Sequence, residues 1–121
     1  TAVGDEGVAA LGHILRRSAP PLAELHLRHN TIGPEGAGTL SESLLDNSTL
    51  RWLFLGWNDV RPEGAERLAD VLRSNASVSF LDLDGNDIGP DGISALTFAL
   101  RENATVDTLW LANNDLGLSG M

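Results

Sequence analysis

Aliphatic residues recur along the chain with a fixed pattern of gaps. In the stretch from Leu22 to Ile32 they occupy positions 1, 4, 6 and 11, and an asparagine occupies position 9. The same eleven-residue pattern returns three times, each time 28 residues further along. The copies are residues 50–60, 78–88 and 106–116. Four copies in register make the chain an array of internal repeats.

The second half of each unit carries a pattern that is typical of a helix. A tetrapeptide of Gly or Arg, Pro, an acidic residue and Gly begins at residues 33, 61 and 89. Aliphatic residues follow at helical spacing, as Leu40 and Leu44 do. Proline suits the first helical position, where no backbone donor is needed, and the acidic residue lies near the positive end of the helix dipole. The pattern also runs backwards through residues 4–15, with an offset of 29.

The sequence of each unit therefore predicts a strand, a loop, a helix and a second loop. In the first strand Leu25 and Leu27 point to one side of the sheet. Glu24, His26 and Arg28 point to the other side. No unit can bury its leucines alone, so the units must stack, and helices wider than the ~4.8 Å strand spacing bend the stack. The predicted fold is an α/β solenoid, a curved right-handed β-α superhelix with a parallel β-sheet on the concave face and α-helices on the convex face.

We expect one domain, residues 1–121, with three whole units and a partial unit at each end. The whole units are residues 22–49, 50–77 and 78–105, and the partial units are residues 1–21 and 106–121. Neither end carries a polar capping unit, and Leu116, Leu118 and Met121 add apolar surface to the last unit. We therefore expect a piece of a longer array, or end-to-end self-association through the uncapped termini.

These units resemble the leucine-rich repeats of the ribonuclease-inhibitor-like subfamily. The pattern L-x-x-L-x-L-x-x-N-x-L, the 28-residue period and the full helix carry the resemblance. Repeats of this type occur in the ribonuclease inhibitor, in nucleotide-binding innate-immune receptors and in the Ran GTPase-activating protein. The resemblance implies the solenoid fold and a macromolecular partner, whereas function in this family lies in the positions that vary.

Two series of asparagines recur, one residue of each series per unit. The first series is Asn30, Asn58, Asn86 and Asn114. An amide both donates and accepts, so we expect this series to satisfy backbone groups where the strands end. The second series, which begins Asn-x-Ser/Thr triplets just past the helices, is Asn47, Asn75 and Asn103. We expect left-handed helix caps there, with glycan attachment as the alternative.

The strand residues that face away from the core are the candidate binding residues. All three tryptophans and two of the three phenylalanines fall at these positions or one step beyond. Large aromatic side chains belong inside a protein unless a partner covers them. The predicted partner-binding residues are Trp52, Phe54, Trp57, Phe80, Trp110, His26, Arg28, Asp82 and Asp84. In the alternative, the rings stack on one another and only stiffen the sheet.

Charge narrows the choice of partner. The chain has 17 acidic residues against 8 basic ones, a net charge of −9, which argues against nucleic acid as a partner. His26 and Arg28 lie at one end of the predicted surface and Asp82 and Asp84 at the other, so a partner of complementary charge would dock in one orientation. No apolar run approaches the ~18 residues of a membrane span. The lack of cysteine and the resemblance together favour an intracellular, cytoplasmic setting.

Catalysis has little support in the sequence. Asp82 and Asp84 would stand ~6.5–7 Å apart on one strand face, a separation found in paired-carboxylate hydrolases, but no pocket is expected around them. Glu24, His26 and His29 would hold a metal only if their faces converged. We expect no enzyme activity, no cofactor and no metal. The alternatives to a binding module are a GTPase-activating or regulatory protein of the Ran-activator type and a structural or engineered repeat scaffold.

Overall fold

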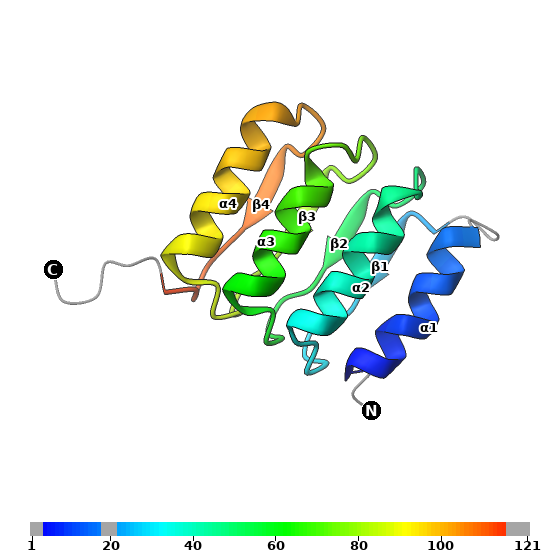
Figure 1. Ribbon diagram of the computed structural model, residues 1–121, viewed down its shortest axis with the longest axis horizontal. Coiled ribbons are helices and arrows are strands. Elements are labelled where there is room, and N and C mark those ends of the chain that lie inside the picture. The colour runs from blue at the N-terminus through cyan, green and yellow to red at the C-terminus, as the bar shows by residue number, and fades with distance from the viewer. Residues whose placement is uncertain (1–3, 18–21, 116–121) are drawn as a thin grey trace, which may run out of the picture.

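A computed structural model describes residues 4–17 and 22–115 of the chain, in which helices and short strands alternate (Figure 1). The elements are α1 (Gly4–Arg17), β1 (Glu24–His26), α2 (Pro34–Leu45), β2 (Trp52–Phe54), α3 (Arg61–Leu72), β3 (Phe80–Asp82), α4 (Gly89–Glu102) and β4 (Thr108–Trp110). The predicted solenoid is therefore confirmed. Leu116, Leu118 and Met121, which bear on the expected uncapped end, lie outside the described residues.

The strands form one parallel sheet whose order follows the chain. Trp52 pairs in register with Glu24 on one side and with Phe80 on the other, and Phe80 pairs with Thr108. Each partner is 28 residues away, so the period of the sequence is the register of the sheet. The helices stand side by side in chain order and cover one face of the sheet (Figure 1).

The core lies between the sheet and the helices. In β2, Leu53 is fully buried between an exposed Trp52 and a half-buried Phe54, which confirms the predicted alternation. Leucines and other aliphatic residues from strands, loops and helices complete one continuous cluster, to which Leu27, Leu55, Leu83, Ile32, Val60, Ile88, Leu40, Leu68 and Leu96 belong. Stacked units thus bury the apolar face that each unit leaves open.

The helices begin as the tetrapeptides predict. Pro34 is the first residue of α2, whereas α3 and α4 start one residue before the proline, at Arg61 and Gly89. Arg61 and Gly89 have φ of 62° and 71°, so right-handed backbone starts at the prolines there too. A Cβ on Gly64 would lie 3.1 Å from the Ala37 Cβ, so glycine at this position lets consecutive helices approach closely.

The first asparagine series joins each unit to the one before it. The Asn58 Oδ1 accepts hydrogen bonds from the backbone N–H groups of Asn30 (2.8 Å) and Ile32 (3.0 Å). The Asn58 Nδ2 donates to the carbonyl of Leu27 at 2.8 Å. Asn114 makes the same two acceptor bonds to the unit that contains Asn86. The structural role predicted for this series is confirmed.

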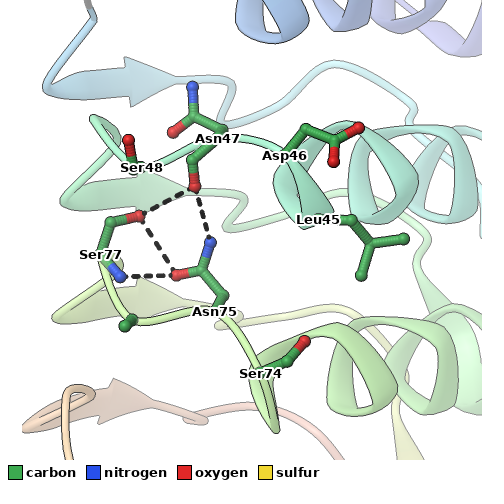
Figure 2. A pocket seen from close by; sticks show the side chains of 8 residues that line it. Leu45, Asp46, Asn47, Ser48, Ser74, Asn75 and Ser77 are labelled. Carbon is green, nitrogen blue, oxygen red and sulfur yellow. Dashed lines mark hydrogen bonds between the residues drawn. The ribbon is translucent and has the colours of Figure 1, made fainter.

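The second series forms another ladder, past the helix ends (Figure 2). The Asn75 Nδ2 donates to the carbonyls of Leu44 (2.9 Å) and Asn47 (3.2 Å), and its Oδ1 accepts from the N–H groups of Ser77 and Val78 (both 2.9 Å). The expected left-handed caps are wrong, because none of these asparagines has a positive φ. Their side-chain amides instead form hydrogen bonds with backbone groups of the loops. A glycan fits poorly at Asn47 and Asn75, since each Nδ2 is buried and already donating.

Candidate protein-binding surface

Two tryptophans stand on the sheet face that the helices leave uncovered, which we call the concave face, and a third, Trp57, stands just past the end of β2. Trp52 is 47 % exposed, Trp110 44 % and Trp57 43 %. Phe54 and Phe80 were expected to be exposed but are half-buried, because neighbouring rings cover part of each: His26 and Phe80 beside Phe54, Trp52 and Trp110 beside Phe80. The expected exposure is therefore found for the tryptophans and in part for the phenylalanines, whereas a role of these rings in binding stays a prediction.

Four of these rings form one group around Phe80, and we call Trp52, Phe54, Phe80 and Trp110 the aromatic cluster. From the Phe80 ring centroid, the ring centroid of Trp110 lies 4.8 Å away, that of Phe54 5.0 Å and that of Trp52 6.4 Å. His26 extends the group by stacking on Phe54 at 4.3 Å. The rings do contact one another, as the alternative interpretation expected, yet the two outer tryptophans keep almost half of their surface in water.

An ion pair crosses the concave face beside the cluster. The Arg28 Nη1 donates to the Asp82 Oδ2 at 2.7 Å, and the Asp82 side chain is fully buried. The expectation that Asp82 is exposed is therefore wrong. The prediction that Arg28 and Asp82 mark two ends of opposite charge is wrong as well, because the two charges neutralise each other within the chain.

Gly56 makes this ion pair possible, and sequence reasoning overlooked it. A Cβ at Gly56 would stand 2.8 Å from the Asp82 Oδ2 and 2.9 Å from the Arg28 Cζ. The missing side chain leaves room just past the end of β2, and the Arg28 guanidinium reaches Asp82 through that space. The aligned units held a signal: the next unit has Gly56 in the Arg28 column, and the unit after that has Asp82 in the His26 column, two residues earlier in the unit.

Asp84, the other predicted acidic residue, is half-buried and supports the backbone. Its Oδ1 accepts a hydrogen bond from the Ala112 N–H at 2.8 Å. The second oxygen of Asp82 accepts from the Asp84 N–H at 3.1 Å. Because the Asp82 carboxylate is sealed and paired with Arg28, the two aspartates do not form an accessible pair of the kind that glycoside hydrolysis requires.

A rim runs past the carboxyl ends of the strands. The rings of His29 and Trp57 are parallel within 4°, with centroids 6.3 Å apart, and they line a shallow recess together with Asp59. Trp57 holds a left-handed φ of 56°, a conformation that costs a bulky residue of the order of 1–2 kcal/mol. Its ring lies over Gly85, where a Cβ would collide with it.

Two further pairs of charged residues lie on the face and the rim. The His26 Nε2 lies 3.1 Å from the Glu24 Oε1. The Asp59 carboxylate accepts a hydrogen bond from Arg61 and raises the pKa of that guanidinium above its usual value, with Asp87 adding to the effect. Within residues 4–17 and 22–115, no three His, Cys, Asp or Glu side chains gather as a metal site would require.

On the convex side, the Phe98 ring of α4 is exposed. It is 49 % exposed, and the Arg73 Cζ from α3 lies 5.0 Å from the ring centroid. The cation–π contact shows that the ring joins α4 to α3.

Comparison with known proteins supports the assignment of this chain to the solenoid repeat proteins. The model for the family described as Leucine Rich repeat matches residues 19–41, 46–69 and 74–96, together more than half of the chain. The chain belongs to the leucine-rich repeat family. No curated protein matches it at a significant level.

A solved structure supports the fold. The structure described as the leiomodin-1 actin-binding site 2 superposes with a TM-score of 0.81 and 25 % sequence identity over 85 % of this chain. The match spans 60 % of that chain, so this protein covers less than two thirds of its neighbour. In the described part of the chain, no helix has both the length and the apolar character that crossing a membrane would need.

Proposed function

We propose that this chain is a protein-interaction module that binds a partner protein through the concave face, with the aromatic cluster as its anchor. The exposure of Trp52 and Trp110 on one side of a four-stranded sheet is the observation that supports it. Tryptophan is among the side chains that most often dominate the binding energy of a protein interface. His26, Arg28, Trp57 and Asp84 would border the contact, and Asp82 would hold Arg28 in place beneath it.

The size of the concave face limits the contact area that a partner can bury. Four strands at about 4.8 Å spacing give a small surface, so a standard footprint of roughly 800 Å² per partner would use most of it. We further infer that the repeats are of the ribonuclease-inhibitor-like type, because a 28-residue period places a full α-helix in each unit.

Actin is the first protein to test as a partner. The neighbouring leiomodin-1 structure is described as an actin-binding site and shares a quarter of its aligned sequence with this chain. Cosedimentation with actin filaments and binding to actin monomers would measure the interaction. Loss of that binding in a variant of the aromatic cluster would assign the contact to the concave face.

The general proposal is tested by capture from a cell extract with wild type and with Trp52→Ala/Trp110→Ala. The double variant should weaken binding of the captured protein by about thirtyfold or more, which corresponds to at least ~2 kcal/mol. Phe98→Ala, which removes an exposed ring from the convex side, is the matched control and should bind as wild type does. If the double variant keeps wild-type affinity, the concave face is not the binding surface.

A further inference from the structure

Phe80 is the central ring of the aromatic cluster, and the two exposed tryptophans lie on either side of it. Phe80 on β3 lies between Trp52 on β2 and Trp110 on β4. The plane of Trp52 is inclined to that of Phe80 by 51° and the plane of Trp110 by 76°. The faces of aromatic rings carry partial negative charge and attract a cation that comes within about 6 Å of a ring centroid. The exposed ring surfaces of Trp52 and Trp110, on either side of Phe80, therefore suit a positively charged side chain.

The charged residues around the aromatic cluster also favour a positively charged side chain. Glu24 pairs in register with Trp52 at one edge of the sheet, and Asp107 directly precedes β4 at the other edge; both are exposed. Arg28 is held by Asp82 at 2.7 Å, so its charge is neutralised within the protein. Arg51, directly before β2, offsets part of the acidic charge, but the chain as a whole carries −9. A cation at the cluster is favoured, and an acidic group is repelled.

We propose that the aromatic cluster receives an arginine or lysine side chain from a basic segment of the partner protein, with Glu24 and Asp107 flanking it. The inference rests on the proposed function and narrows its partner to one with exposed basic residues. An acidic segment would meet Glu24 and Asp107 as like charges. A wholly apolar segment would cover these carboxylates without giving either a partner, which carries a desolvation penalty.

The chain's own fluorescence measures this binding, because all three tryptophans lie on the concave face or its rim. The probes are a tetra-arginine amide, the tetra-citrulline amide of nearly the same shape without charge, and a tetra-glutamate amide. We expect the arginine peptide to bind about tenfold more tightly than the citrulline peptide, and the glutamate peptide to bind most weakly. Equal affinity for arginine and citrulline peptides would overturn the proposal.

Variants separate the contribution of the rings from that of the charges. Phe80→Leu and Trp110→Leu should each weaken arginine-peptide binding by about threefold to tenfold, with Phe98→Leu on α4 as the unaffected control. Glu24→Gln/Asp107→Asn should weaken it similarly. Glu66→Gln/Asp70→Asn changes the net charge equally on the exposed side of α3. If this control pair weakens binding as much as the first pair, only net charge matters and the proposal fails.

The outcomes also distinguish this inference from the function on which it rests. If a captured partner depends on Trp52 and Trp110 but arginine peptides show no preference over citrulline peptides, the binding module stands and the basic segment is wrong. If neither the partner nor the arginine peptide depends on the cluster, both are wrong. Circular dichroism of every variant ensures that a lost signal reports binding and not unfolding.

Discussion

The asparagine ladders and the aromatic cluster are built on the same repeats but follow opposite rules. Asn58, Asn86 and Asn114 are identical from unit to unit, and their amides bond to backbone groups of the preceding unit. In the column of the cluster that contains Trp52, the aligned residues are Glu24, Phe80 and Thr108, which are all different. A residue that repeats serves the stack, whereas a residue that breaks the period is free to serve a partner.

The Arg28–Asp82 pair shows the limit of this rule. Neither residue repeats at the equivalent position of another unit, yet the Asp82 carboxylate is buried and the pair spans three consecutive units. Departure from the period therefore identifies a candidate binding residue only when the side chain is also exposed. Variants of the asparagine ladder, of the Arg28–Asp82 pair and of the aromatic cluster should therefore lower the stability of the protein by successively smaller amounts.

Asn86→Ala should give the largest loss of stability. The Asn86 side chain is fully buried; it donates to the carbonyls of Leu55 and Asp84 and accepts from the Val60 N–H. Its removal leaves buried backbone groups without partners, so the free energy of unfolding should fall by about 2–4 kcal/mol. Urea unfolding followed by circular dichroism measures the change. Glu66→Ala, an exposed change on α3, should stay within about 0.5 kcal/mol, and a similar loss there would show that the assay reports something other than the ladder.

Arg28→Ala should have an intermediate effect. It leaves the buried Asp82 carboxylate without its cation, but the new gap admits water, so we expect a loss of about 1–3 kcal/mol, below the value for a fully buried pair. The double variant Arg28→Ala/Asp82→Ala should recover part of that loss in the same unfolding assay. Two single changes whose effects simply add would mean that the pair contributes no coupling energy.

The fold was predictable because its information is periodic. Units of equal length must stack with equivalent residues side by side, so a spacing of 28 in the sequence dictates that Trp52 pairs with Glu24 and Phe80. Strand geometry alone places Leu53 in the core and turns the rings of Trp52 and Phe54 to the opposite side of the sheet. The exposure of Trp52 and Trp110 followed from the same argument.

Contacts that run diagonally between units were not predictable in this way. The Arg28–Asp82 pair spans 54 residues and depends on the absence of a side chain at Gly56 between them. Asn75 was expected to cap its helix by adopting a left-handed backbone conformation. Its side-chain amide instead bonds to the neighbouring unit, so that conformation is not needed. Such outcomes depend on the size and reach of particular neighbours, which a repeat pattern does not encode.

Trp52→Ala and Trp110→Ala should have the smallest effect on stability and the largest on binding. Each ring keeps almost half of its surface in water, and its contact with Phe80 contributes about 0.5–1.5 kcal/mol. We therefore expect each single change to lower the free energy of unfolding by about 1 kcal/mol or less. A loss above ~3 kcal/mol from either change would mean that the ring is part of the core in energetic terms. The aromatic cluster would then belong with the ladders, and its departure from the period would need a structural explanation like that of Arg28 and Asp82.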